Sequence, residues 1–110
     1  LITDMTDRKT FRLIYEPPTQ EKRDALRAKH PDAIQLWMLG KWCATYGSDA
    51  AKTACVVLDI DPTLAMTMGG GITEYQFDSH ALDTVLPKLV RAGYRVCIYE
   101  VEPRKEYITE

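Results

Sequence analysis

The chain has 110 residues, of which 45% are hydrophobic and 27% are charged, with a formal net charge of -2. This composition is typical of one soluble globular domain, so we expect residues 1–110 to fold as a single module. No apolar run approaches the ~20 residues of a membrane span, and residues 1–10 lack the apolar middle of a signal peptide. We therefore expect a cytoplasmic protein without a membrane partner. Because the first residue is leucine rather than methionine, we also expect a segment of a larger parent protein.

Charge and cysteine usage argue against several classes of protein. The sequence pI is about 5.7, whereas dedicated nucleic-acid binders are commonly basic, so any affinity for DNA should be local and weak. Cys43, Cys55 and Cys97 are far apart and lack Cys-x-x-Cys spacing. This pattern argues against a metal knuckle or a disulfide framework, and we expect neither a metal nor another cofactor.

The first third of the chain predicts a strand, a helix and a second strand. Residues 10–16 (TFRLIYE) alternate in polarity like a strand, and the proline pair that follows ends it. Thr19 is a good cap for a helix over 20–30. Ala33–Leu39 (AIQLWML) has apolar residues on both faces of an extended strand, which indicates an interior strand covered on both sides.

The middle of the chain predicts a loop, a helix and a hairpin. Residues 40–47 (GKWCATYG) have a glycine at each end and are interpreted as a loop. Ser48 is expected to cap a helix over 49–57, whose small residues favour close packing on a sheet. Three successive glycines at 69–71 predict a hairpin turn between strands at 63–68 and 72–77.

The last third predicts a helix followed by two strands. The helix spans 80–92, with a kink or a division into two helices at Pro87 and Gly93 as its C-terminal cap. An interior strand at 94–100 and an edge strand at 105–109 complete the pattern. The chain is therefore predicted to be an α/β (α+β) domain with a mixed central β-sheet flanked by helices.

Three segments resemble the N-terminal mismatch-recognition domain, domain I, of the DNA mismatch-repair protein MutS. They are residues 29–40 (KHPDAIQLWMLG), 48–60 (SDAAKTACVVLDI) and 80–100 (HALDTVLPKLVRAGYRVCIYE). The similarity covers about 19–100 and is strongest in the last third. It implies the domain I fold, double-stranded or distorted DNA as a partner, other domains of a parent protein as further partners, and no catalytic residues.

The resemblance also assigns candidate DNA-binding residues. In the family, a Phe-x-Glu element stacks on a mispaired base through Phe and hydrogen-bonds it through Glu. Here Trp42 occupies the Phe position and Ala44 the Glu position, so the stacking residue has a substitute and the hydrogen-bonding residue does not. Lys41 and Tyr46 complete the candidate set. Trp42 is expected to be exposed, the alternative being a ring packed in the core, and Tyr46 also fits a core position.

Two other functions remain open. The fold could serve as a protein interaction module without DNA contact, which the acidic balance and Ala44 favour. A metal-dependent nuclease could gather four carboxylates, from Asp59, Asp61, Glu100 and Glu102. The lysine that a restriction-type nuclease core places two residues after its second acid is missing, however, since that place is Glu102 after Glu100.

Overall fold

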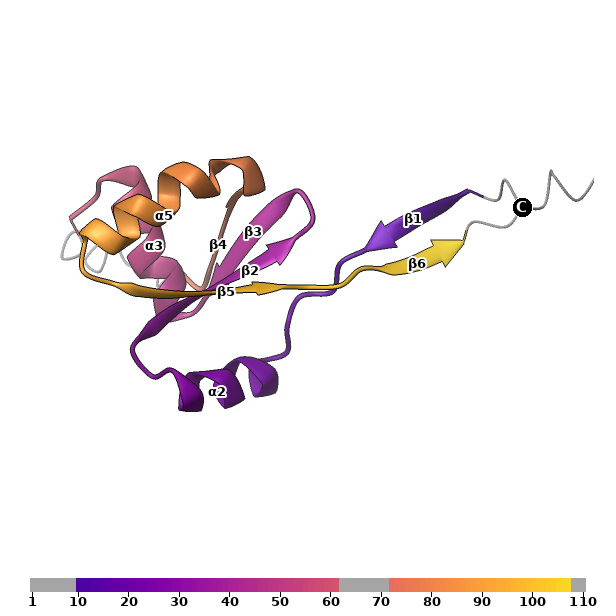
Figure 1. The fold of residues 1–110 in the computed structure, drawn as a ribbon, viewed down its shortest axis with the longest axis horizontal. Helices are drawn as coiled ribbons and strands as arrows, with labels where there is room; N and C mark the ends of the chain where they lie inside the picture. Colours follow the sequence, from indigo (N-terminus) through magenta and orange to yellow (C-terminus); the bar gives the residue numbers. More distant parts are fainter. Residues whose placement is uncertain (1–9, 62–71, 108–110) are drawn as a thin grey trace, which may run out of the picture.

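The computed structural model describes residues 10–61 and 72–107. A body of one β-sheet and its helices is joined to a two-stranded ribbon that projects from it (Figure 1). The principal-axis extents are 63 × 28 × 27 Å, and the ribbon accounts for the long axis. In chain order, the elements are β1 (Phe11–Ile14), α2 (Gln20–Lys29), β2 (Ala33–Leu39), β3 (Trp42–Tyr46), α3 (Ser48–Leu58), β4 (Glu74–Asp78), the 3-10 turn η1 (Ser79–Ala81), α5 (Leu82–Arg91), β5 (Arg95–Glu100) and β6 (Arg104–Tyr107).

The body sheet is mixed and has the strand order β4-β3-β2-β5. Strand β2 pairs antiparallel with β3 and parallel with β5, and β3 pairs antiparallel with β4. Helices α3 and α5 cover one face of the sheet and α2 covers the other (Figure 1). The predicted α/β fold with a mixed, helix-flanked sheet is confirmed.

The main core lies between the sheet and the pair α3 and α5. Successive strand residues point to opposite faces, so alternate residues of β2 and β3 enter this core. It consists of Ile34, Leu36, Cys43, Phe77, Val85 and Leu89, all buried. The amphipathic helix α5 closes it, because its buried residues Val85 and Leu89 are four apart and lie on one face.

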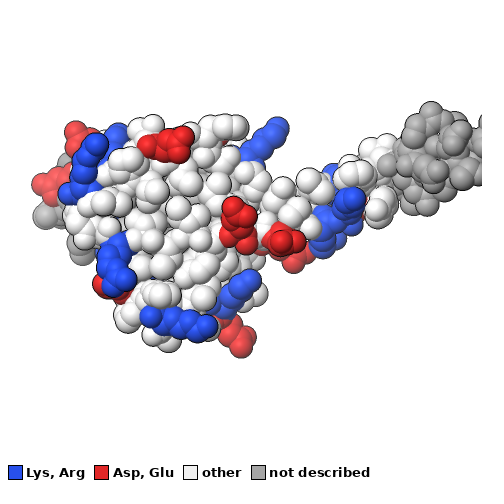
Figure 2. Space-filling view, in the orientation of Figure 1, with Lys and Arg blue, Asp and Glu red and all other residues white. Residues whose placement is uncertain are grey.

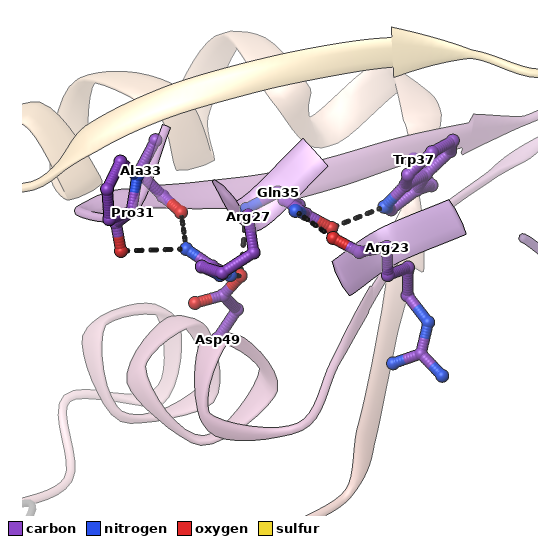
Figure 3. A network of polar contacts seen from close by, with 7 residues as sticks. All are labelled: Arg23, Arg27, Pro31, Ala33, Gln35, Trp37 and Asp49. Carbon is purple, nitrogen blue, oxygen red and sulfur yellow. Dashed lines mark hydrogen bonds and ion pairs between the residues drawn. The ribbon is translucent and has the colours of Figure 1, made fainter. Parts of the chain in front are cut away.

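The opposite face of the sheet is fixed to α2 by a polar network (Figure 3). Asp49 is almost fully buried at the start of α3 and accepts hydrogen bonds from the Gln35 backbone N–H, at 3.0 Å, and from the Arg27 guanidinium. Arg27 also donates to the backbone carbonyl of Ala33. The Trp37 ring lies beside this network and stacks on Tyr99 with centroids 4.6 Å apart. Since the buried carboxylate is paired, the network holds α2 and α3 in a defined position on the sheet.

Helix ends follow the predicted chemistry in two places and depart from it in one. The Thr19 hydroxyl accepts from the Lys22 backbone N–H and caps α2. Gly93, with φ +94°, ends α5 in a Schellman arrangement, because Tyr94 N–H donates to Leu89 O and Gly93 N–H to Val90 O. The α3 cap is Gly47 and not the predicted Ser48, which is already the first helical residue.

Several predicted elements need correction. Residues 42–46 form strand β3 and not a loop, because the turn is confined to residues 40–41. The strand predicted at 94–100 is an edge of the described sheet and not an interior strand, since β5 pairs only with β2 there. Helix α5 continues through Pro87, and the break in the helical segment comes earlier, where η1 meets α5.

The two outermost predicted strands form a separate sheet. Strands β1 and β6 pair antiparallel with each other and with no strand of the body within the described residues, so the expected edge strand at 105–109 instead belongs to the ribbon. The strand predicted at 63–68 and the glycine turn at 69–71 lie outside the described residues. No helix of the described ranges is long and apolar enough to cross a membrane.

Candidate nucleic-acid interface

The candidate interface begins at the tip of the β2–β3 hairpin. Leu39 and Trp42 are cross-strand partners, so the turn between them consists of only Gly40 and Lys41. Gly40 has φ +67°, whereas Lys41 has a negative φ, and this combination is the type II′ turn that suits a two-residue hairpin. The hairpin therefore presents Lys41 and Trp42 on a short, well-defined turn.

Trp42 is exposed, as predicted, with 52% of its surface accessible. It is the first residue of β3, at the end of the sheet that projects past α2 (Figure 1). The second tryptophan, Trp37, is only 1% exposed and stacks on Tyr99. The structure thus gives Trp37, in the strand predicted to be covered on both faces, a core position and leaves Trp42 accessible.

A groove of about 660 Å³ lies beside the Trp42 ring. Its lining residues come from the hairpin tip and from the chain segment that leaves the ribbon: Leu13, Tyr15, Leu39, Gly40, Lys41 and Trp42. The Tyr15 ring lies directly against Gly40, since a Cβ atom built on Gly40 would be 2.7 Å from Tyr15 Cε2. Gly40 thus serves both the turn and the close approach of Tyr15.

Sequence reasoning missed Leu13 and Tyr15 as members of this site. Residues 10–16 were assigned to a strand of the sheet, and the contact of Tyr15 with Gly40 joins residues 25 positions apart. Leu13 and Tyr15 are two positions apart, and residues at this spacing in an extended segment point to the same side. This spacing is the sequence feature that places the two side chains together.

Charged groups next to Trp42 are mixed in sign. Lys41 is exposed and has no ion-pair partner in the part of the chain that the structure describes. Asp78 is the cross-strand partner of Trp42, and its carboxylate accepts from the His80 backbone N–H at 2.8 Å and lies 2.9 Å from His80 Nδ1. These two hydrogen bonds from His80, and the charge of Lys41, lower the pKa of Asp78. The Asp78 carboxylate is therefore engaged in starting η1.

Tyr46 does not join Trp42 and Lys41. It lies at the other end of β3, about 13 Å along the strand at ~3.3 Å per residue. The Arg23 guanidinium lies over its ring, 4.7 Å from the centroid, and burial, the largest of several influences, raises the pKa of its hydroxyl. This half-buried position fits the core alternative of the sequence prediction.

Ala44, two residues after Trp42, is fully buried. Its cross-strand partner is Trp37, also buried, so position 44 lies on a buried part of the sheet.

The carboxylates considered for a nuclease do not assemble. Within residues 10–61 and 72–107, no three His, Cys, Asp or Glu side chains lie close enough to hold a metal ion. Glu100 and Glu102 do line a hollow of about 390 Å³, but together with Tyr15, Met38 and Gly40. Cys43 and Cys55 are buried, and Cys97 is partly buried.

Comparison with known proteins assigns the sequence to a family. The family model for MutS domain I matches residues 18–108. Proteins named DNA mismatch repair protein MutS are similar to the chain: that of Parabacteroides distasonis is 40% identical over 77% of the chain, that of Bacteroides fragilis 47% over 66%, and that of Porphyromonas gingivalis 39% over 84%. The chain spans about a tenth of the length of each of these relatives, between 8% and 10%. The chain belongs to the MutS domain I family.

Proposed function

We propose that this chain is a non-catalytic DNA-binding module that contacts distorted duplex DNA through Trp42 and Lys41. The observation that carries the proposal is the exposed indole at the tip of a tight hairpin, at the position where the resemblance puts the stacking residue of the family. The relatives are named as DNA mismatch-repair proteins, which supports the same class of ligand. An indole face can stack on a base of any identity, for about 1–3 kcal/mol.

The proposed binding is weak because, among the described residues that line the groove with the indole, Lys41 is the one cation. The net charge of -2 gives no general attraction to phosphates, and the Asp78 carboxylate beside Trp42 opposes them. Lys41 offsets this carboxylate locally. We expect duplex dissociation constants in the micromolar range or weaker at physiological salt.

Mismatch discrimination is expected to be small. The hydrogen-bonding half of the family's reading pair is replaced by Ala44, whose position is fully buried. Stacking alone does not report base identity, since every base has a π-face. The module therefore detects distortion of the duplex and not a particular mispair.

Fluorescence anisotropy with matched and G·T-containing duplexes of one length tests this function. We expect micromolar binding to both, with less than a tenfold preference for the mismatch. Nanomolar affinity, or a tenfold preference, would contradict the assigned role of Ala44. Undetectable binding to any DNA would favour the second candidate.

That second candidate is a protein interaction module with the same fold. The acidic balance, the enclosed Ala44 and the exposed apolar residues of the ribbon favour it. In either role, the partners would include other domains of a larger parent protein, given the small share of each relative that the chain covers.

A further inference from the structure

The β1–β6 ribbon sorts its side chains by chemistry between its two faces. Cross-strand partners share a face, and Phe11 is paired with Tyr107, and Leu13 with Lys105. This face is aromatic and aliphatic with one cation. The other face carries Arg12 paired with Glu106, its cross-strand partner, so the one acidic residue of the two strands is turned away from the aromatic side.

The aromatic face of the ribbon is open. Phe11 is 44% exposed, Leu13 46% and Tyr107 55%. Neighbouring apolar side chains that are exposed together form a patch of the kind that often marks a binding surface. The rings of Phe11 and Tyr107 contact each other with centroids 5.8 Å apart, and Lys105 Nζ lies 4.8 Å from the Phe11 ring centroid. A two-stranded ribbon of this size is marginal alone, so a ligand on this face would also stabilise it.

This face continues into the groove beside Trp42. Leu13 belongs to both, and Tyr15, two residues further along the extended chain, lines the same groove. Aromatic and aliphatic side chains thus form one track from the hairpin tip to the ribbon, with Lys41 at the hairpin tip and Lys105 opposite Leu13 within the ribbon. We define the aromatic track as Phe11, Leu13, Tyr15, Lys41, Trp42, Lys105 and Tyr107.

Charge favours a nucleic acid on this track. Basic side chains gather over the ribbon (Figure 2), and Lys105 is the one that shares the aromatic face, because Arg12 and Arg104 lie on the other face opposite Glu106 and Ile14. Glu106 and Glu16 are ion-paired with Arg12 and Arg104, whereas Glu100 and Glu102 line a neighbouring hollow with Tyr15. The rings of Phe11, Trp42 and Tyr107 are exposed and Tyr15 is half-buried between them. Exposed rings with cations beside them are the arrangement on which successive unpaired bases stack.

We propose that the aromatic track binds a short stretch of single-stranded DNA next to the duplex that Trp42 contacts. This inference rests on the proposed function for the Trp42 end and extends it to an unpaired strand along the ribbon. Bases stack on the Tyr15, Phe11 and Tyr107 rings, and Lys41 and Lys105 approach the phosphates. The preferred ligand is then a fork or flap, in which duplex and single strand meet.

Anisotropy with three probes tests the inference: a blunt duplex, the same duplex with an unpaired oligo-dT arm, and oligo-dT alone. We expect the forked probe to bind about tenfold tighter than the blunt duplex, as loss of one base–aromatic stack would weaken it again by about that factor. Phe11→Leu and Tyr107→Leu keep the apolar surface but remove the rings, so each should abolish most of the preference and leave blunt-duplex binding unchanged.

The control is Val90→Ala, which truncates an equally exposed apolar side chain on α5, away from the ribbon. It should bind all three probes like the parent chain. Circular dichroism checks that each leucine variant is folded, and Lys105→Gln provides an independent test that does not alter the apolar surface.

The outcomes separate this inference from the proposed function. Equal affinity for forked and blunt duplexes would overturn the single-strand site and leave Trp42-dependent duplex binding standing. Binding of oligo-dT without any duplex binding would support the track and overturn the duplex role. Absence of both, with concentration-dependent dimerisation in sedimentation, would make the ribbon face an interface between copies of the chain and contradict both proposals.

Discussion

Two residues two positions apart on one strand have opposite environments. Trp42 extends past α2 and is half exposed, whereas Ala44 lies beside Trp37 and is fully buried. The sequence identified both as departures from the family's Phe-x-Glu element. It could not show that the second position is buried, because its neighbour Trp37 comes from another strand.

Restoring the missing carboxylate should therefore fail. Ala44→Glu would bury an unpaired charge, at a cost of roughly 3–5 kcal/mol in unfolding free energy at pH 7. Burial raises the pKa of such a carboxyl, so the folded state would bind the proton more tightly than the unfolded state, and the deficit relative to the parent chain should shrink as pH falls toward 5. Urea unfolding at both pH values measures this.

Ala44→Gln serves as the control, because it adds a side chain of similar volume without the charge. Its deficit should not change between the two pH values. An Ala44→Glu variant that is as stable as the parent chain and gains a G·T preference would show that this position reaches the ligand after all.

At the scale of elements, local chemistry predicted most of the body. The Thr19 cap, the Gly93 terminus and the strand at Ala33–Leu39 follow from single residues and their spacing. Pairing between distant segments did not follow. The ribbon joins residues 90 to 96 positions apart, and the five residues of β3 lie between two glycines that suggest a loop.

The β2–β3 turn offers a test of how the groove is built. Gly40 and Gly47 have nearly the same positive φ, +67° and +63°, but only Gly40 has a neighbour, Tyr15, within reach of a Cβ. Alanine at either site should cost about 1–3 kcal/mol for the backbone conformation. Gly40→Ala should cost more, since its Cβ meets the Tyr15 ring.

Thermal melts of both variants measure this difference, and the double variant Gly40→Ala with Tyr15→Ala should recover the excess. Equal losses for Gly40→Ala and Gly47→Ala would mean that Tyr15 moves away without cost. The groove would then not be held in shape by this contact.

At the scale of the whole molecule, the fold brings the hairpin tip and the ribbon to the two sides of one groove. The fold of the body follows from the hydrophobic pattern and from the segments that resemble the family, so this part was predictable. The candidate site was predictable only at Lys41 and Trp42, since Leu13 and Tyr15 reach it through the path of the chain between the ribbon and α2. Tyr46 shares the sequence stretch but lies at the far end of β3.

The exposed indole at the hairpin tip is the centre of this account, and Trp42→Ala tests it most directly when melting and DNA binding are measured on the same preparation. Because the ring is 52% exposed and outside the main core, the melting temperature should stay within about 2 °C of the parent chain. Duplex binding should become undetectable, while Val90→Ala should leave both quantities unchanged. Unaltered binding would remove Trp42 from the interface, and a loss of roughly 3–5 kcal/mol in stability, as for a large-to-small core substitution, would return its ring to the core.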